Sequence, residues 1–321
     1  MSFLTNIYFW AFIFILLGIK LYFKITTGIC MSIRRLDGKT VIVTGANTGI
    51  GKETARDLAR RGAKVILACR DLKKAEEASD EIIASTGNIN VKVQHLDLSS
   101  LSSVRQFAEH INKTELRLDV LINNAGAAGM NHKLTRDNLS IGMQVNHFGP
   151  FLLTCLLVGL LKKSAPSRIV MVSSILHKYA NFDIDNLNSE KWFGSTQVYN
   201  CSKLANILVA NELARRLKGT GVTANSLHPG TVITDVWRRA SRITKAFVFG
   251  ILKFYVKDSV EGAQTTIHLA VSEEVEKVSG KYFVDCKEAK PSKLALDEGL
   301  AKKLWEKSEM MVGLKSEENP F

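Results

Sequence analysis

The sequence predicts an α/β fold in which one doubly wound parallel sheet carries helices on both faces and follows an N-terminal membrane anchor helix. From residue 39 onward, short runs rich in β-branched residues alternate with amphipathic stretches of helical length. This alternation implies crossover connections between parallel strands. Before that point, residues 3–19 contain no charged side chain. We therefore expect an anchor over residues 1–24, a linker over 25–38, one large domain over 39–312 and a flexible tail over 313–321.

The uncharged stretch FLTNIYFWAFIFILLGI is just long enough to span a bilayer. No basic residue precedes it and no small-residue cleavage site follows it, which disfavours a cleaved signal peptide. A cleaved signal and a buried or interfacial helix are the alternatives to an anchor. Basic residues lie on its C-terminal side, so the positive-inside rule places the domain in the cytosol: Lys20, Lys24, Arg34, Arg35 and Lys39. We expect a single pass through the endoplasmic reticulum membrane, with a lipid droplet or mitochondrial membrane as alternatives.

The strands expected in the large domain are nearly continuous in apolar residues, which is typical of a sheet covered on both faces. They are residues 40–45, 64–69, 91–98, 119–126, 168–174 and 222–230. Helical stretches separate them, among them 51–62, 71–86, 102–112 and 199–217.

Composition excludes several classes of function. The net charge of +12 suggests an anionic partner. The sequence has no zinc-finger spacing, RNA-binding aromatic motif or concentrated basic helix, so nucleic acid is not expected. The five cysteines are scattered, odd in number and form no CxxC pair. This pattern predicts neither a disulfide framework nor a metal site, and favours a reducing compartment.

The segment TGANTGIG, residues 44–51, places three glycines between the first expected strand and the next helix. Glycines at such a turn let backbone N–H groups approach a pyrophosphate, which the positive end of the helix dipole also attracts. A glycine-rich turn without a ligand is the alternative. The position after the first strand of a parallel sheet favours the ligand. The sequence therefore predicts a Rossmann-type dinucleotide site.

The second expected strand discriminates between the two nicotinamide cofactors. An NAD site usually presents an acid about 20 residues after the glycine turn, whereas an arginine accommodates the additional phosphate of NADP. Here Cys69 stands at the position of the acid and Arg70 follows it. A surface arginine paired with Asp71 is the alternative. We expect NADP(H).

Several residue types suited to proton transfer follow the later strands. Tyr199 and Lys203 are four residues apart, which places them on one face of a helix. A nearby ammonium group lowers the pKa of a phenol toward the working range of a proton-transfer catalyst. Ser174 ends a strand on the edge where open α/β sheets build their sites. NNAG at residues 123–126 closes another strand, and Asn146 lies in the helix beyond it.

These motifs together resemble the short-chain dehydrogenase/reductase family, and within it the membrane-anchored retinol dehydrogenase branch. The resemblance covers residues 1 to about 312. It rests on TGANTGIG, ACRD, LDLSS, LINNAG, QVNHFGPFLLT, VSS, YNCSKLAN, HPGTVIT and SGKYFVDC. The segment 175–196, between Ser174 and Tyr199, is longer than in typical soluble members and leaves the wall of the substrate pocket open.

The resemblance implies a role for each matching residue. Tyr199 is then the proton donor or acceptor, Lys203 holds the nicotinamide ribose, and Ser174 holds the substrate oxygen. Asn146 supports a proton-relay water, Asp97 contacts the adenine and Asn124 helps to seat the adenosine ribose. The cofactor is expected to contact Gly45, Ala46, Asn47, Thr48, Gly49, Ile50, Gly51, Arg70, Asp97, Leu98, Asn124, Ala125, Gly126, Tyr199, Lys203, Pro229, Gly230, Val232 and Thr234.

The resemblance further implies reduction of all-trans retinal to retinol with NADPH. The same chemistry on a steroid, a fatty aldehyde or another lipid carbonyl is the first alternative, and a non-catalytic NADP-binding scaffold is the second. Residues 236–258 combine six basic side chains with aromatic ones, as membrane-surface helices do. They are expected to form a lid at the membrane, or else to pack on the domain or on a second subunit. Formation of a homo-oligomer is left open.

Overall fold

The computed structural model describes residues 24–191, 194–232 and 257–321, together with residues 8, 10, 14, 18, 20 and 21. Eight strands form one sheet in the order β3-β2-β1-β4-β5-β6-β7-β8. Every neighbouring pair is parallel except β7 and β8. The strands are β1 (Thr40–Thr44), β2 (Lys64–Cys69), β3 (Val91–His95), β4 (Val120–Asn123), β5 (Ser167–Val172), β6 (Val222–His228), β7 (Tyr282–Val284) and β8 (Lys287–Ala289).

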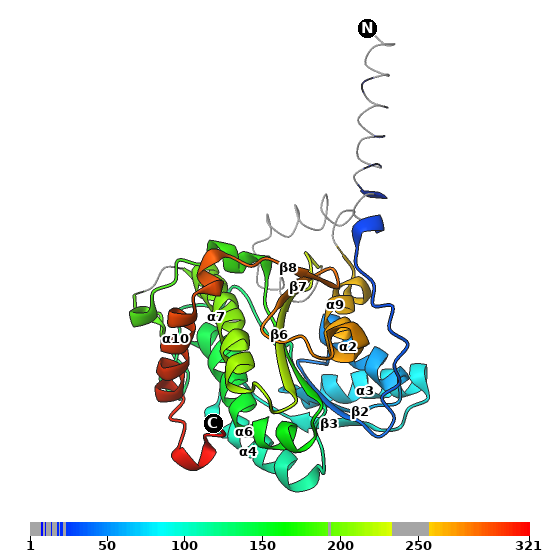
Figure 1. Ribbon diagram of the computed structural model, residues 1–321, viewed down its shortest axis with the longest axis horizontal. Helices are drawn as coiled ribbons and strands as arrows, with labels where there is room; N and C mark the ends of the chain where they lie inside the picture. The colour runs from blue at the N-terminus through cyan, green and yellow to red at the C-terminus, as the bar shows by residue number, and fades with distance from the viewer. Residues whose placement is uncertain are drawn as a thin grey trace.

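Helices cover both faces of this sheet, as the sequence predicts (Figure 1). One layer contains α2 (Gly49–Arg60), α3 (Leu72–Thr86) and α9 (Ser259–Val271). The other contains α4 (Leu101–Thr114), α6 (Gly149–Lys163), α7 (Ser195–Arg216) and α10 (Glu298–Met311). Successive side chains of β1 point to opposite faces of the sheet. Val41 and Val43 pack in the hydrophobic core between the sheet and the first layer of helices, and Ile42 packs in the core between the sheet and the second layer.

The observed strands end earlier than the sequence analysis expects. The third strand stops at His95 rather than residue 98, the fourth at Asn123 rather than 126, and the sixth at His228 rather than 230. The residues beyond each end form the loops that surround the candidate site and line its cavity. The hairpin of β7 and β8 was not expected, because three-residue strands are too short to show a period of two.

The C-terminal residues 313–321 do not form the loose tail that their polar composition suggests. Arg105 makes two hydrogen bonds with the carboxylate of Glu318, at 2.7 and 3.0 Å. The ring of Phe321 packs edge-on against Trp305, with the ring centroids 5.2 Å apart. These contacts fix the terminus on α4 and α10, so the expectation of a flexible tail is corrected.

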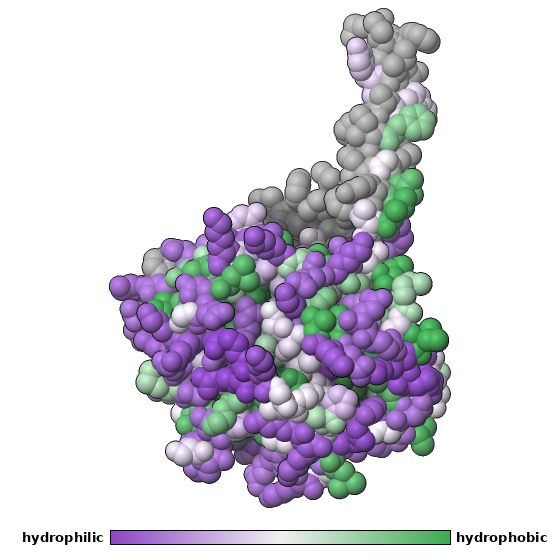
Figure 2. Space-filling view, in the orientation of Figure 1, coloured by the Kyte–Doolittle hydropathy of each residue, from purple (hydrophilic) through white to green (hydrophobic). Residues whose placement is uncertain are grey.

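Most of the expected anchor lies outside the described residues. Those that are described are helical and stand clear of the globular domain, and hydrophobic residues are visible on this projection (Figure 2). The side chains of Phe14 and Leu21 are exposed. The linker then attaches to the domain: Gly28 N–H donates to Asp285 and Cys30 N–H donates to Gln264. Within the described residues, the one helix long and apolar enough to cross a bilayer is Ile141–Lys163, whose apolar stretch is 83% buried in the domain.

Candidate active site

The glycine turn joins the end of β1 to the start of α2 and leaves no room for side chains. Gly45 and Gly49 have positive φ angles of 66° and 56°. A Cβ atom on Gly51 would lie 2.5 Å from the amide nitrogen of Asn124. The turn therefore presents bare backbone at the N-terminus of α2, which is the environment that favours an anion.

Two side chains hold this turn against the end of β4. The Asn124 side-chain amide donates to the carbonyl oxygen of Thr44 at 2.9 Å. The Thr44 hydroxyl accepts from the N–H groups of Asn124 and Ala125 at 3.0 and 2.9 Å. The sequence analysis assigned Asn124 to a ribose and did not single out Thr44. A threonine at a strand end has many roles, so no local pattern marks this one.

The end of β2 carries the residues expected to discriminate between cofactors. Cys69 is buried, and backbone groups of the glycine turn lie next to its sulfur. Arg70 is exposed and lines the cavity. Asp71 does not pair with it in the described structure; its side chain caps α3 by accepting from Lys74 N–H at 3.2 Å. The described structure therefore does not contain the alternative ion pair between Arg70 and Asp71.

The candidate catalytic groups come from the end of β5 and the start of α7. The Ser174 side chain lies within interaction range of the Tyr199 phenol, and both groups line the same cavity. Lys203 Nζ donates to the carbonyl oxygen of Val172 at 3.0 Å and lies 5.6 Å from the centroid of the Tyr199 ring. The Ser173 hydroxyl donates to the carbonyl oxygen of Lys203 at 2.6 Å, which ties the end of β5 to α7. One strand and one helix therefore place all three groups.

Asn146 lies in a short π-helix, η1 (Gln144–Phe148), just before α6. Its amide is fully engaged with the loop after β4: the oxygen accepts from Ala127 N–H at 2.8 Å and the nitrogen donates to Ala127 O at 2.9 Å. The nitrogen also donates to the Ser202 hydroxyl at 3.1 Å. In the described structure this side chain holds the loop against α7 and does not line the cavity.

A cavity of about 1220 Å³ connects the glycine turn with Ser174, Tyr199 and Lys203. This is larger than the roughly 300–1,000 Å³ of most ligand pockets. Nearly every residue expected at the site lines it. Ala46 does not, because it packs in the core under the turn, and Thr234 lies outside the described residues. The sequence analysis missed the apolar wall, which comes from positions scattered along the chain: Met130, Ile141, Val145, Ile175 and Leu176.

Known proteins share both the sequence and the arrangement. The family described as short chain dehydrogenase matches residues 39–244. The chain belongs to the short-chain dehydrogenase family. Human retinol dehydrogenase 11 is 48% identical over 290 residues, covering 90% of this chain and 91% of that one. Human retinol dehydrogenase 14 is 49% identical over 296 residues, covering 87% and 88%. These identities place the chain in the retinol dehydrogenase branch of the family.

Solved structures agree with this assignment. The Pseudomonas aeruginosa RhlG/NADP active-site complex has a TM-score of 0.63 at 25% identity, and the match covers 78% of this chain and 95% of that one. The short-chain dehydrogenase fold, with its nicotinamide-cofactor edge at the carboxyl ends of the strands, is therefore the frame for Ser174, Tyr199 and Lys203.

The electrostatics of this short-chain dehydrogenase differ from expectation at the tyrosine. Burial raises the pKa of Tyr199, and the hydrogen bond with Ser174 only partly opposes it. Burial also lowers the pKa of Lys203 to about 8. The expected net lowering of the tyrosine pKa does not appear, because desolvation of the phenol outweighs the opposing interaction with Ser174. Burial therefore favours the protonated phenol of Tyr199.

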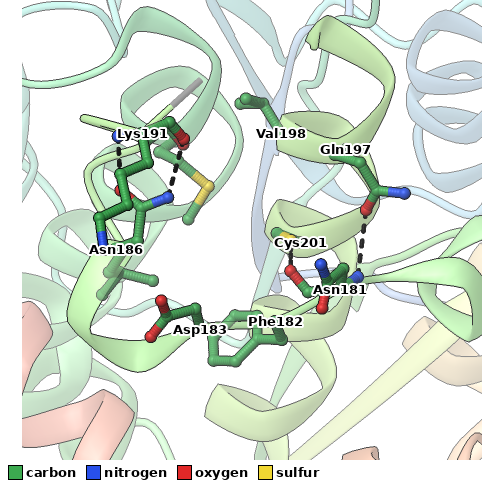
Figure 3. A pocket seen from close by; sticks show the side chains of 11 residues that line it. Asn181, Phe182, Asp183, Asn186, Lys191, Gln197, Val198 and Cys201 are labelled. Atoms are coloured by element: carbon green, nitrogen blue, oxygen red, sulfur yellow. Dashed lines mark hydrogen bonds between the residues drawn. The ribbon is translucent and has the colours of Figure 1, made fainter. Parts of the chain in front are cut away.

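The long segment after Ser174 folds back onto α7 (Figure 3). The Asn186 side chain bonds both backbone groups of Lys191, at 2.8 and 2.9 Å. The Gln197 side chain accepts from Asn181 N–H at 3.1 Å, and the Cys201 thiol donates to Asn181 O at 3.3 Å. The hollow between these groups holds only about 20 Å³, room for about one water. This segment therefore buttresses α7 rather than adding a second ligand pocket.

Proposed function

We propose that this protein is an NADP(H)-dependent oxidoreductase that interconverts a lipophilic aldehyde and its alcohol, with reduction of all-trans retinal to retinol as its main reaction. The observation that carries the proposal is that Ser174, Tyr199 and Lys203 line the same cavity as the glycine turn. Asn146 positions the loop after β4 against α7.

The residues at the adenosine end fit the larger cofactor. The turn has the bare backbone that a pyrophosphate needs, since a Cβ on Gly51 would collide with Asn124. Cys69 offers no carboxylate to a ribose, while Arg70 offers fork-shaped donors to a phosphate. Asp97 lines the same end; its Oδ1 accepts from the N–H and the hydroxyl of Ser99 at 2.9 and 2.7 Å. The relative solved with NADP supports this choice.

When bound, NADPH supplies the hydride. The chain's own groups then act on the carbonyl oxygen. Ser174 Oγ accepts from Leu176 N–H at 3.2 Å, which leaves its hydroxyl proton free to be donated to the substrate oxygen. Tyr199 donates its phenolic proton to the same oxygen as the carbon receives hydride, which yields the alcohol and a tyrosinate that solvent reprotonates. Charged Lys203 stabilises this tyrosinate.

The apolar wall of the cavity supports a lipophilic substrate. Ile175 and Leu176 directly follow Ser174, Met130 lies in the loop after β4, and Ile141 begins the helical segment that follows this loop. The names of the human relatives favour a retinoid. A steroid, a fatty aldehyde or another lipid carbonyl is the alternative on the same machinery, and a cofactor-holding scaffold without turnover is the remaining one.

A membrane location suits such a substrate. The described N-terminal helical residues expose large apolar side chains, with Phe14 69% and Leu21 60% exposed. We propose that they belong to a single-pass anchor in the endoplasmic reticulum membrane with the domain in the cytosol. Lipid droplets and mitochondria are alternatives for the same anchor. The basic, aromatic segment 236–258 is proposed to lie over the substrate entrance, although nearly all of it falls outside the described residues.

The test offers the full-length protein in microsomes a panel of carbonyls with NADPH and, in parallel, with NADH. The panel contains all-trans retinal, medium- and long-chain aldehydes and ketosteroids. NADPH-dependent loss of retinal supports the whole proposal. Turnover of another carbonyl alone keeps the chemistry and removes the retinoid, a preference for NADH removes the cofactor assignment, and cofactor binding without turnover favours the scaffold.

A further inference from the structure

A buried histidine lies immediately behind the candidate catalytic serine. His177 belongs to the short 3₁₀-helix η2 (Ile175–Tyr179), which Ser174 caps. Its side chain is only 1% exposed and does not line the cavity. The sequence analysis gave this histidine no chemical role. Its contacts nevertheless end on the backbone of Ser174.

The hydrogen bonds of His177 fix its tautomer. Nε2 lies 3.0 Å from the backbone nitrogen of Ser292, whose N–H can only donate, so Nε2 must accept. Nδ1 then carries the proton and donates to the carbonyl oxygen of Ser174 at 2.7 Å. Burial lowers the pKa of His177, which keeps the ring neutral as this arrangement requires. With both nitrogens engaged, His177 is not a proton carrier for the substrate.

Ser174 is consequently held on two sides. Its carbonyl oxygen accepts from the side chain of His177 and also from the His177 backbone N–H at 3.1 Å. Its hydroxyl accepts from Leu176 N–H and lies within interaction range of the Tyr199 phenol. Loss of the imidazole donor releases the side of the serine that faces away from the substrate. A displacement of about 1 Å at a reacting group can cost about 100-fold in rate.

The opposite edge of the imidazole is fixed by elements far along the chain. Its ring packs edge-on against Tyr282 of β7, with the centroids 5.2 Å apart. Ser292 begins the 3₁₀-helix η7 (Lys293–Leu296), which follows β8. The histidine thus connects the serine to two segments of the C-terminal region that otherwise lie outside the cavity.

We propose that His177 is a positioning residue for Ser174, acting through the Nδ1–H bond to the serine carbonyl, while its Nε2 bond to Ser292 holds the ring in place. This inference rests on the proposed function, because Ser174 must orient a substrate oxygen for its position to matter. Its expected signature is a loss of kcat with little change in the KM for NADPH.

Two substitutions separate the two hydrogen bonds. In His177→Asn, the side-chain amide nitrogen takes the place of Nδ1 and still donates to Ser174, while Ser292 N–H loses its acceptor. In His177→Gln, the longer side chain reaches Ser292, and the serine carbonyl loses its side-chain donor and keeps only the backbone N–H of residue 177. Each variant removes one side-chain hydrogen bond to a backbone group, so similar losses of thermal stability are expected. The thermal midpoint alone therefore does not distinguish them.

Turnover distinguishes them. We expect His177→Asn to keep kcat within about threefold of wild type and His177→Gln to lose about 10- to 100-fold, with the KM for NADPH unchanged in both. His110→Gln, on the exposed face of α4, is the control and should match wild type. Equal losses in the two variants, or the larger loss in His177→Asn, would overturn the inference.

A measurement without turnover keeps the inference separate from the proposed function. The tautomer of His177 is read from two-bond ¹H–¹⁵N couplings of wild-type protein in detergent, with its signal assigned by absence from the spectra of the variants. An Nδ1–H tautomer supports the inference even where no carbonyl in the panel is reduced, an outcome that removes only the proposed function. An Nε2–H tautomer contradicts it.

Discussion

Lys203 Nζ donates to the carbonyl oxygen of Val172 at 3.0 Å, which ties the lysine to the strand that ends two residues before Ser174. A Cβ on Gly126 would lie 3.0 Å from the same Nζ, so the loop after β4 also approaches it closely. The ammonium group therefore sits where three elements converge: β5, α7 and the loop after β4. Any tilt of α7 displaces the lysine and Tyr199 together, because both occupy one face of this helix.

The glycine turn should not tolerate a methyl group at its tightest point. In Gly51→Ala, the new Cβ meets Asn124 and Gly45 O, each at 2.5 Å. We expect a loss of about 1–3 kcal/mol in the free energy of unfolding and loss of NADPH binding. Gly159→Ala is the matched control, since nothing lies within 4 Å of its Cβ position in α6. It should gain about 0.5–1 kcal/mol. Urea unfolding and cofactor fluorescence measure both; equal behaviour would contradict the close packing.

Arg70 should determine the choice between the two cofactors. In Arg70→Ala, a phosphate on the adenosine ribose loses a charge-assisted donor, while a cofactor without this phosphate loses nothing comparable. We expect the KM for NADPH to rise about 10- to 100-fold and that for NADH to stay nearly constant. Lys73→Ala, at an exposed position of α3, is the control. A uniform rise for both cofactors would show that Arg70 serves the fold instead.

Acid should destabilise the domain through buried histidines. His147 is fully buried against Ser308, and burial lowers its pKa to about 3. Below pH 6.5, the pKa of His147 in the unfolded chain, the unfolded chain binds a proton at this histidine that the folded chain does not bind. The stability present above pH 6.5 is thus lost at about 1.4 kcal/mol per pH unit as the pH falls toward 3.

His147→Gln retains a partner for Ser308 without titrating. Between pH 7 and pH 5, the wild type should lose about 2 kcal/mol more than this variant in urea unfolding. His110→Gln, a substitution at an exposed histidine, should follow the wild type across the same range. Parallel profiles for wild type and His147→Gln would mean that His147 is protonated in the folded protein.

The C-terminal residues should contribute to stability. Removal of residues 316–321 deletes the Glu318–Arg105 pair, whose side chains are 15% and 28% exposed, and the contact of Phe321 with Trp305. We expect the free energy of unfolding to fall by about 2 kcal/mol. Met310→Ala, at an apolar residue of α10 that is 70% exposed, is the control and should change it little. A truncated protein as stable as wild type would restore the picture of a loose tail.

Sequence patterns predicted the features that local chemistry dictates. The apolar runs predicted β1, β2 and β5 to within two residues at either end, because buried parallel strands need continuous apolar chains. The glycine turn and the spacing of Tyr199 and Lys203 were visible for similar reasons: each depends on neighbours within a few residues.

Features that depend on distant partners were not predictable in this way. Thr44 secures the loop after β4, and His177 contacts Ser292, which is more than a hundred residues away. The polar C-terminal sequence gave no sign that Phe321 would find Trp305. The apolar cavity wall is likewise assembled from separate loops. In each case the residue type is ordinary, and only the folded arrangement gives it its role.

The central claim is that Tyr199 donates the proton in an NADPH-dependent reduction at this site. Its most direct test compares single-turnover reduction of all-trans retinal by wild type and Tyr199→Phe in microsomes, with NADPH binding followed by fluorescence in the same preparations. The account predicts a rate lower by about 100- to 10,000-fold in the variant, with NADPH affinity within about twofold of wild type. Retention of the wild-type rate by Tyr199→Phe would contradict the assignment of the proton donor and the mechanism built on it.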